Sequence, residues 1–293
     1  MTRDLPVWRS MMFVPVIVEK FVDSAPGRGA DAYILDLEDS IPLAEKARAR
    51  GLIREAAAKV GRDGADVVVR INRPWRLAVR DLEASVCAEI TAIALPKVAD
   101  AGHVRAIAEV LDEVEQEAGL ARGHTAIIPM IETVDAFFEV RDIARAHPRV
   151  VAMTLGAEDF ALSAGMLPEA EGLFYPKQQT ILAARAAGIL PLGFVGSVAE
   201  YRDQDKFRAT IEQARRLGFR GGFCIHPLQV GIMNAGFAPA SEEVDMARRL
   251  IAAYDEAVAA GRGAVEFEGK MIDEPIVIRA RETLTQAERI ARR

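Results

Sequence analysis

Two apolar stretches rich in β-branched residues end abruptly in acidic residues. The stretch TAIIPMIE closes at Glu132, and VVAMTLGAEDF carries Glu158 and Asp159 directly after its apolar run. Short apolar runs bounded by turn signals are typical of buried parallel strands. Because the carboxyl ends of neighbouring parallel strands meet at one edge, Glu132 and Asp159 could share one cation. Their hard oxygen donors favour Mg²⁺, with Mn²⁺ as a further possibility. The alternative is that each acid caps the next helix or pairs with an arginine.

Other polar residues end further apolar runs along the chain. They are Asp36, Glu38, Asp39, Arg70, Asn72, Lys97 and His226. The guanidinium of Arg70 could hold a substrate carboxylate bidentately, or form a buried ion pair with Asp36 or Glu38, and both can be true together. Lys97, after Pro96, could neutralise a phosphate or thioester oxygen, or lie in solvent.

The acids at positions 36, 38 and 39 are candidates to accept hydrogen bonds from metal-bound water. Strand alternation places Asp36 and Glu38 on one face and Asp39 on the other. Gly156 permits close approach of the backbone to a ligand, and Glu158 is expected beside it in the substrate site.

His226, which precedes Pro227, is a candidate acid/base group, although a core or capping histidine is at least as good an interpretation. The sequence contains no G-x-S-x-G, G-x-G-x-x-G or P-loop motif and no Ser-His-Asp or Cys-His nucleophile signature. A Schiff base on Lys97 is conceivable. The carboxylate pair makes a metal-assisted route more economical, in which Mg²⁺ polarises a carbonyl and steadies an enolate during C–C bond cleavage or formation.

The elements that must position these residues alternate between strand and helix about eight times. We expect strands at Arg9–Val16, Ala32–Asp39, Asp66–Asn72, Ile90–Val98, Thr125–Glu132, Val150–Leu155, Leu190–Val195 and Gly222–Ile225. We expect helices at Val18–Ala25, Pro42–Val60, Leu77–Cys87, His103–Ala118, Val134–Ala146, Lys177–Ala187, Asp205–Leu217 and Leu228–Ala235. Residues 161–176 are expected to form an irregular loop. The alternation predicts a (β/α)₈ TIM barrel, with a doubly wound open sheet as the alternative.

After Phe237 the pattern changes, so we predict a barrel domain at residues 1–237 and a C-terminal helical extension at 238–293. The extension is expected to hold a helix, a short extended piece and a last helix, at Glu242–Ala260, Ala264–Ile272 and Val277–Arg292. It is too short for an independent core. We interpret it as a lid or arm that packs on a neighbouring subunit.

Composition narrows the class of protein. The chain has 293 residues, 51% of them hydrophobic and 27% charged, with a net charge of −6. This balance argues against a nucleic-acid partner. The N-terminus has no apolar signal region, and no run approaches the roughly 18 apolar residues of a membrane span, so we expect a cytoplasmic protein without a membrane partner. Cys87 and Cys224 are too far apart in sequence to indicate a disulfide framework or zinc site.

A series of motifs resembles the HpcH/HpaI aldolase and citrate lyase β-subunit family, in particular its stand-alone CoA-ester lyases. The motifs are RSMMFVP, GADAYILDLEDSIPLAEKARAR, VVVRIN, ALPKV, PMIET, LGAEDFA, GFCIHPLQV, NAGFAP and GKMIDEPIV. The resemblance implies a TIM barrel with a C-terminal extension, assembled as homotrimers or hexamers. It implies Mg²⁺ held by Glu132 and Asp159, a keto-acid carboxylate bound by Arg70, and Asp273 delivered from a neighbouring subunit as the acid/base group. From the residues alone, Asp273 is a turn residue.

The chemistry implied by the resemblance is reversible cleavage of a 3-hydroxyacyl-CoA, such as malyl-CoA or citramalyl-CoA, into an acyl-CoA and a 2-oxo acid. Val16 stands where this branch usually has glycine, which can alter the approach of CoA. The alternatives are an aldolase acting on a non-CoA 4-hydroxy-2-oxo acid, a thioesterase, and a non-catalytic carrier-associated subunit.

Overall fold

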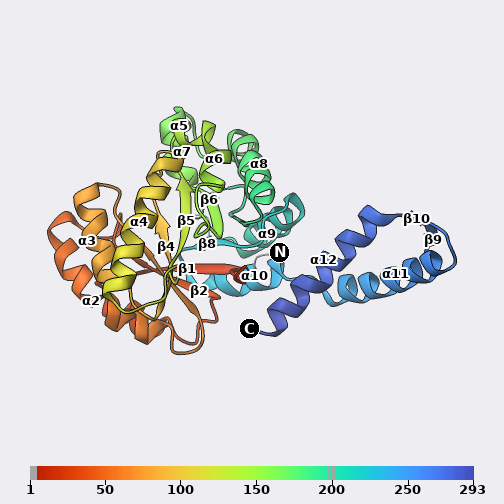
Figure 1. Ribbon diagram of the computed structural model, residues 1–293, viewed down its shortest axis with the longest axis horizontal. Coiled ribbons are helices and arrows are strands. Elements are labelled where there is room, and N and C mark those ends of the chain that lie inside the picture. The colour runs from red at the N-terminus through yellow and green to blue at the C-terminus, as the bar shows by residue number, and fades with distance from the viewer. Residues whose placement is uncertain (1–4, 197, 199–201) are drawn as a thin grey trace. The chain divides into compact units, whose positions relative to one another are not determined.

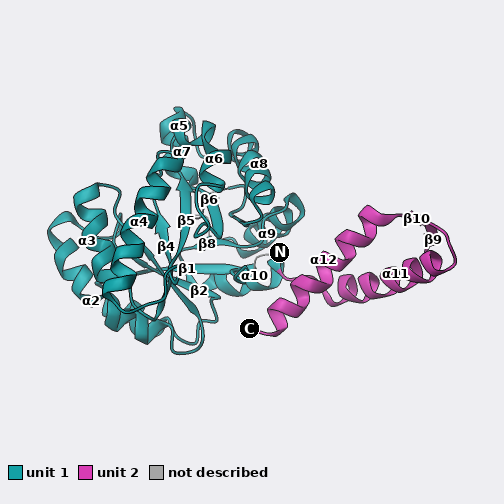
Figure 2. Cartoon of the chain, viewed as in Figure 1, with its two compact units in different colours: residues 1–237 teal, residues 238–293 magenta. Residues whose placement is uncertain are grey.

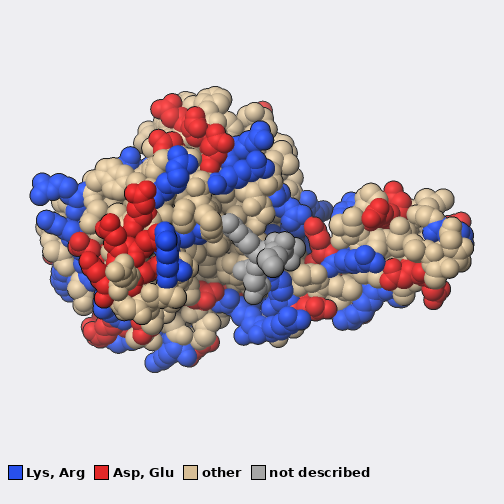
Figure 3. Space-filling view, in the orientation of Figure 1, with Lys and Arg blue, Asp and Glu red and all other residues tan. Residues whose placement is uncertain are grey.

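The computed structural model describes residues 5–196, 198 and 202–293. The chain divides into two compact units, residues 1–237 and 238–293 (Figure 2). Acidic and basic side chains are interspersed over the visible face of each unit (Figure 3). Among the described residues, no helix is both long enough and apolar enough to cross a membrane.

The first unit is built on eight parallel strands. They are β1 (Ser10–Pro15), β2 (Ala32–Asp36), β3 (Asp66–Arg70), β4 (Ile90–Leu95), β5 (Ala126–Ile131), β6 (Ala152–Leu155), β7 (Leu190–Leu192) and β8 (Gly222–Cys224). Neighbours in the sheet follow chain order from β1 to β7, and β8 pairs with β1. A parallel bridge between Leu192 and Gly221 joins β7 to the start of β8. The sheet therefore forms a nearly closed ring surrounded by helices (Figure 1), which confirms the predicted (β/α)₈ barrel and excludes the doubly wound alternative.

The barrel interior is filled by side chains from alternate strand positions. Ile34 lies beside Val68, which lies beside Ala92, and all three are fully buried. The interior is therefore a packed core and not a pore. The same register sets Asp36 beside Arg70 where β2 and β3 end. Asp36 and Arg70 thus lie at the carboxyl end of the strands, beyond the apolar core to which Ile34 and Val68 belong.

Helices cover the outside of the ring. They are α1 (Glu19–Ser24), α2 (Lys46–Val60), α3 (Trp75–Ser85), α4 (Ala101–Glu117), α5 (Val134–Phe138), α6 (Val140–Ala144), α7 (Ala157–Ala164), α8 (Ala170–Ala187), α9 (Gln204–Leu217) and α10 (Pro227–Phe237), with the short 3₁₀ helix η1 (Leu43–Glu45) before α2. Most expected helices are present with ends shifted by a few residues.

Two helix predictions are wrong. The expected loop at 161–176 contains the second half of α7 and the first turns of α8, with Pro176 inside α8. Proline usually interrupts a helix, but here Leu173 and Pro176 are both buried, and tertiary packing stabilises the turns before it. The single helix expected at 134–146 is divided at Glu139, where the backbone leaves the helical region between α5 and α6.

The second unit is a helical hairpin with a small antiparallel sheet at its turn. It consists of α11 (Ser241–Ala259), β9 (Val265–Phe267), β10 (Lys270–Ile272) and α12 (Glu274–Ala291). The two helices pack along one another and bury Ala257 and Val277. The last helix begins three residues before the predicted start because Pro275 occupies its first turn, where the missing N–H costs nothing.

Candidate active site

Asp36 and Arg70 form a bidentate ion pair at the carboxyl ends of β2 and β3. Arg70 Nε and Nη2 donate to the two Asp36 carboxylate oxygens at 2.7 and 2.8 Å. Asp36 also accepts the backbone N–H groups of Glu38 and Ser40. Burial opposes ionisation of Asp36, but the hydrogen bonds from Arg70 outweigh it and lower the pKa of the carboxyl. The guanidinium also lies over the Phe13 ring, 4.7 Å from its centroid.

Glu38 lies between the two cationic side chains of the barrel mouth. Its Oε2 is 3.0 Å from Arg70 Nη1, and its Oε1 accepts a hydrogen bond from Lys97 Nζ at 2.8 Å. Burial is the main cause that raises the pKa of Glu38. Lys97 Nζ also lies 3.7 Å from Asp159 Oδ1, while exposed Asp39 is 3.5 Å from Arg70. Although alternation predicted opposite faces for Asp36 and Asp39, both reach Arg70 because β2 ends at Asp36.

Glu132 is a buried acid of the mouth, with 2% of its surface exposed, close to the 1% of Asp36. Its Oε2 accepts the backbone N–H of Lys97 at 2.6 Å. Burial first, and then the negative charges of Glu38 and Asp159, raise the pKa of Glu132 to about 8. A Cβ at Gly156 would lie 2.8 Å from the Glu132 carboxylate, so only glycine fits beside this side chain.

Lys46, which the sequence did not indicate, and Asn72 help to hold this arrangement in place. Lys46 Nζ donates to the backbone oxygens of Leu37 and Glu38, both at 2.6 Å. A lysine in the first turn of α2 opposes the helix dipole, and that unfavourable placement is the signal in the sequence. Asn72 donates to Leu37 O and to Asp81, so its role in this structure is to support the turn after β2.

The remaining predicted site residues lie in different surroundings. Glu158 is an exposed residue in the first turn of α7. Burial lowers the pKa of Lys177 to about 8, and the negative charge of Glu158 acts in the opposite direction. His226 Nδ1 accepts the backbone N–H of Leu228, so it contributes to the start of α10. Asp273 precedes α12 in the second unit, and its carboxylate makes no capping hydrogen bond there. Val16 is buried in the hydrophobic core with 2% exposure.

The oxygen donors of the mouth are of the kind that bind a hard cation. Its ligating groups are carboxylate oxygens, and Glu38 Oε2 is a buried atom that, among the described residues, has an ion-pair contact but no hydrogen-bond donor in suitable geometry. Within the described part of the chain, no three His, Cys, Asp or Glu side chains are gathered closely enough to enclose a metal by themselves. This combination fits Mg²⁺, which takes one or two carboxylates and completes its shell with water and substrate oxygens.

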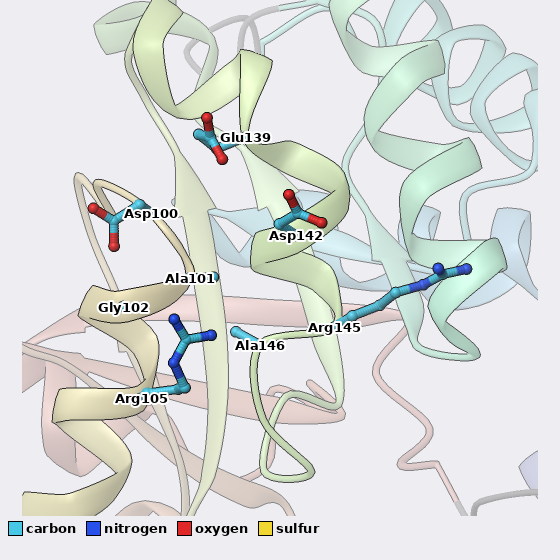
Figure 4. A pocket seen from close by; sticks show the side chains of 8 residues that line it. All are labelled: Asp100, Ala101, Gly102, Arg105, Glu139, Asp142, Arg145 and Ala146. Carbon is cyan, nitrogen blue, oxygen red and sulfur yellow. The ribbon is translucent and has the colours of Figure 1, made fainter.

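A cavity of about 580 Å³ lies away from these residues, between the start of α4 and α6. Its lining includes Asp100, Arg105, Glu139 and Asp142 (Figure 4). Arg145 turns toward α8, where it donates to Ala186 O. The cavity contains none of the predicted site residues, so we do not assign the active site to it.

Residues 9–227 match the sequence profile of the HpcH/HpaI aldolase/citrate lyase family. The chain belongs to this family. As a family member, the protein is an enzyme with CoA-ester lyase or aldolase-type activity. Family membership thus agrees with the resemblance in the strand-end motifs.

Relatives in the HpcH/HpaI family cover nearly the whole chain. The citrate lyase subunit beta of Leuconostoc mesenteroides is 34% identical over 282 residues, covering 95% of this chain and 93% of the relative. A (3S)-malyl-CoA thioesterase of Cereibacter sphaeroides is 34% identical over 289 residues, covering 97% and 96%. The crystal structure of Mycobacterium tuberculosis CitE, in complex with magnesium, acetoacetate and coenzyme A, is 29% identical with a TM-score of 0.73, covering 97% of this chain and 99% of that one.

Proposed function

We propose that the protein is a Mg²⁺-dependent lyase that cleaves or forms a 3-hydroxyacyl-CoA, such as malyl-CoA or citramalyl-CoA. The products of cleavage are an acyl-CoA and a 2-oxo acid. The observation that carries the proposal is the barrel mouth, where Arg70 and Lys97 both contact Glu38, and Lys97 also contacts the buried acid Glu132 and Asp159. The magnesium, acetoacetate and coenzyme A bound by the M. tuberculosis relative support the same ligand classes.

Glu132 and Asp159 are the residues we assign to the metal, with Mn²⁺ as a substitute. Bound Mg²⁺ supplies a Lewis acid for the 2-oxo acid oxygens. The Lys97 N–H holds Glu132 in place, and Gly156 leaves room for its carboxylate. Asp36, Glu38 and Asp39 surround the site as acceptors for water and for the cationic side chains.

Arg70 binds the carboxylate of the 2-oxo acid portion. Asp36 occupies the Nε and Nη2 side of its guanidinium and Glu38 lies 3.0 Å from Nη1, so the substrate carboxylate would compete with Glu38 for Nη1. The Asp36 clamp and the Phe13 ring fix the orientation of the guanidinium before substrate arrives. We assign Gly156, Glu158 and Lys97 to binding of the substrate as well.

The bond changes follow from the substrate. The C3 hydroxyl gives its proton to solvent as its oxygen forms the carbonyl of the 2-oxo acid, the C2–C3 bond breaks, and the electron pair of that bond becomes the thioester enolate. We assign to Asp273 the return of a proton to the enolate carbon, which completes the acyl-CoA. No capping hydrogen bond occupies its carboxylate, which supports this role.

Asp273 belongs to the second unit, which we propose packs as an arm on a neighbouring subunit of a homotrimer or hexamer. Exposed apolar side chains on this unit support the proposal, because they require a covering surface. They are Met246, Val258, Met271 and Ile278.

The arm is tested by mixing two inactive variants, Asp273→Ala and Asp159→Asn. If Asp273 acts across an interface, mixed oligomers regain part of the activity because some sites have both intact residues. Absence of activity in mixed oligomers verified by mass spectrometry contradicts the shared site. A mixture of Asp273→Ala with itself is the control.

The substrate is tested with a panel of 3-hydroxyacyl-CoA thioesters, with Mg²⁺ and with chelator. Mg²⁺-dependent release of glyoxylate or pyruvate supports the lyase. Release of free CoA without a 2-oxo acid supports a thioesterase, which similarity to the (3S)-malyl-CoA thioesterase keeps as the second candidate. If the folded protein releases neither a 2-oxo acid nor free CoA from any ester, both the lyase and the thioesterase are contradicted. The next substrates to test would then be non-CoA 4-hydroxy-2-oxo acids.

A further inference from the structure

Lys97 contacts both of the residues that we assign to the metal. Its backbone N–H donates to Glu132 Oε2 at 2.6 Å, and its Nζ lies 3.7 Å from Asp159 Oδ1. The same ammonium is 2.8 Å from Glu38 Oε1 and 3.9 Å from Asp39 Oδ1. One side chain therefore brings a positive charge to carboxylates that follow three different strands.

The backbone at Lys97 is held in an unusual conformation. Its φ of 45° lies in the left-handed region, which among the described non-glycine residues only Glu268 shares. This conformation is unfavourable for a non-glycine residue. The turn directs the N–H toward Glu132 while the side chain reaches Glu38, so both ends of the residue serve the acid-rich mouth.

The mouth contains more carboxylates than cationic side chains, even with Lys97 included. Arg70 is already committed to Asp36 and Glu38, so Lys97 is the cation that faces Glu132 and Asp159. The named carboxylates outnumber the named cations by three; they are Asp36, Glu38, Asp39, Glu132 and Asp159 against Arg70 and Lys97. A divalent cation at Glu132 and Asp159 would meet the Lys97 ammonium as a like charge.

We propose that Lys97 is a positioning residue whose ammonium stands in for the divalent cation at the Glu132–Asp159 site and withdraws from Asp159 when the cation binds. This inference rests on the proposed function, which assigns the metal to these two carboxylates. Lys97 keeps its hydrogen bond to Glu38 during the exchange. It holds the metal-free cluster together and, for the same electrostatic reason, weakens the binding of the cation.

The experiment is calorimetric titration of the full-length, chelator-treated protein with Mg²⁺, together with its melting temperature with and without Mg²⁺. Lys97→Met should bind Mg²⁺ roughly tenfold more tightly than the wild type, because a like charge is removed within a few ångströms. Its melting temperature should be lower without metal and should recover toward the wild-type value at saturating Mg²⁺. Lys97→Arg, which keeps the charge, should stay within about threefold of wild-type affinity.

Lys59→Met is the matched control, since Lys59 also pairs with two acids, Asp23 and Glu55, each at 3.2 Å on the surface of the barrel. This variant should leave Mg²⁺ affinity unchanged. If Lys97→Met does not fold, Lys97→Gln takes its place, because its carboxamide can still donate to Glu38 without a charge.

Equal or weaker Mg²⁺ binding by the uncharged Lys97 variant overturns this inference and leaves the proposed lyase intact, since the wild type still binds the metal. Mg²⁺ binding by neither protein overturns both the inference and the metal assignment. Tighter binding by Lys97→Met and by Lys97→Arg alike also overturns it, because the charge would then not be the cause.

Discussion

The barrel carries a cluster of charged side chains at each end, and the two clusters differ in the balance of acids and cations. The base cluster, at the start of β5 and β6, consists of Asp112, Glu115, Arg122 and Arg149. The mouth cluster, at the carboxyl end of the strands, consists of Asp36, Glu38, Asp39, Arg70, Lys97, Glu132 and Asp159. Two acids face two arginines at the base, whereas acids exceed cations at the mouth.

Glu115 shows what a satisfied buried acid looks like. It is fully buried, pairs with Arg149 through both carboxylate oxygens at 2.6 Å, and accepts the N–H groups of Gly123 and Thr125. Burial opposes its ionisation, but Arg149 and these N–H groups prevail and lower its pKa. Glu132 has comparable burial without an arginine, and its pKa is raised to about 8. A cluster whose carboxylates are all paired with arginines of the chain stabilises the fold, whereas a cluster with excess carboxylates is suited to an external cation.

The largest expected effect comes from Asp159→Asn at the mouth. Loss of a metal ligand should reduce Mg²⁺-dependent turnover on the order of 10³-fold, because charge developing on the substrate loses its electrostatic partner. The melting temperature of the metal-free protein should change little. Initial rates at saturating Mg²⁺ and a thermal melt in chelator measure the two quantities, and full activity in the variant would remove Asp159 from the metal site.

Glu115→Gln at the base should have the opposite effect from Asp159→Asn, because it should reduce stability and leave activity nearly unchanged. Breaking a buried charge pair leaves Asp112 as the acid that still pairs with Arg149 and should lower the free energy of unfolding by about 3 kcal/mol. The kcat of the folded variant should stay near the wild-type value. Urea unfolding and kcat measured on the same preparation test this, and a kcat loss as large as that of Asp159→Asn would erase the distinction between the clusters.

Exchanging arginine for lysine compares the two clusters directly. Arg70→Lys should raise the KM for the 2-oxo acid in the condensation direction roughly 10- to 100-fold, because lysine cannot hold both Asp36 and a carboxylate in a planar fork. Arg149→Lys, the matched control, should cost stability and leave this KM unchanged. An equal KM in wild type and Arg70→Lys would argue against carboxylate binding by Arg70.

The smallest effect concerns the pH dependence of stability in the metal-free protein. The raised pKa of Glu132 means that the native state binds its proton more tightly than the unfolded chain. Its contribution is therefore complete below the unfolded pKa of about 4.3 and is lost as pH rises toward about 8, with a slope of at most about 1.4 kcal/mol per pH unit.

Glu132→Gln should remove this loss, which urea unfolding at several pH values in chelator can measure. Glu115, whose pKa is lowered, works in the opposite direction: its stabilisation is present above the unfolded pKa and is lost on acidification. An identical pH profile in wild type and Glu132→Gln would contradict the raised pKa at the mouth.

Local pattern was sufficient to predict much of the barrel and the acids of its mouth. The run TAIIPMIE identifies β5 and the position of Glu132 because continuous burial and a charged end are properties of neighbouring residues. The same reasoning failed at 161–176, where an irregular loop was expected but burial of Leu173 stabilises the start of α8. Propensity is a weak prior that tertiary contacts override.

The sequence by itself determined which residue types stand at the ends of the strands and in what order those strands follow. Only the tertiary structure decided how they pair, because the contacts join residues far apart in the chain. The parallel register sets Arg70 beside Asp36, and the left-handed turn at Lys97 brings its N–H to Glu132. The charge states were decided at the same level, since the pKa of a carboxyl depends on burial and on the charges that the fold places around it.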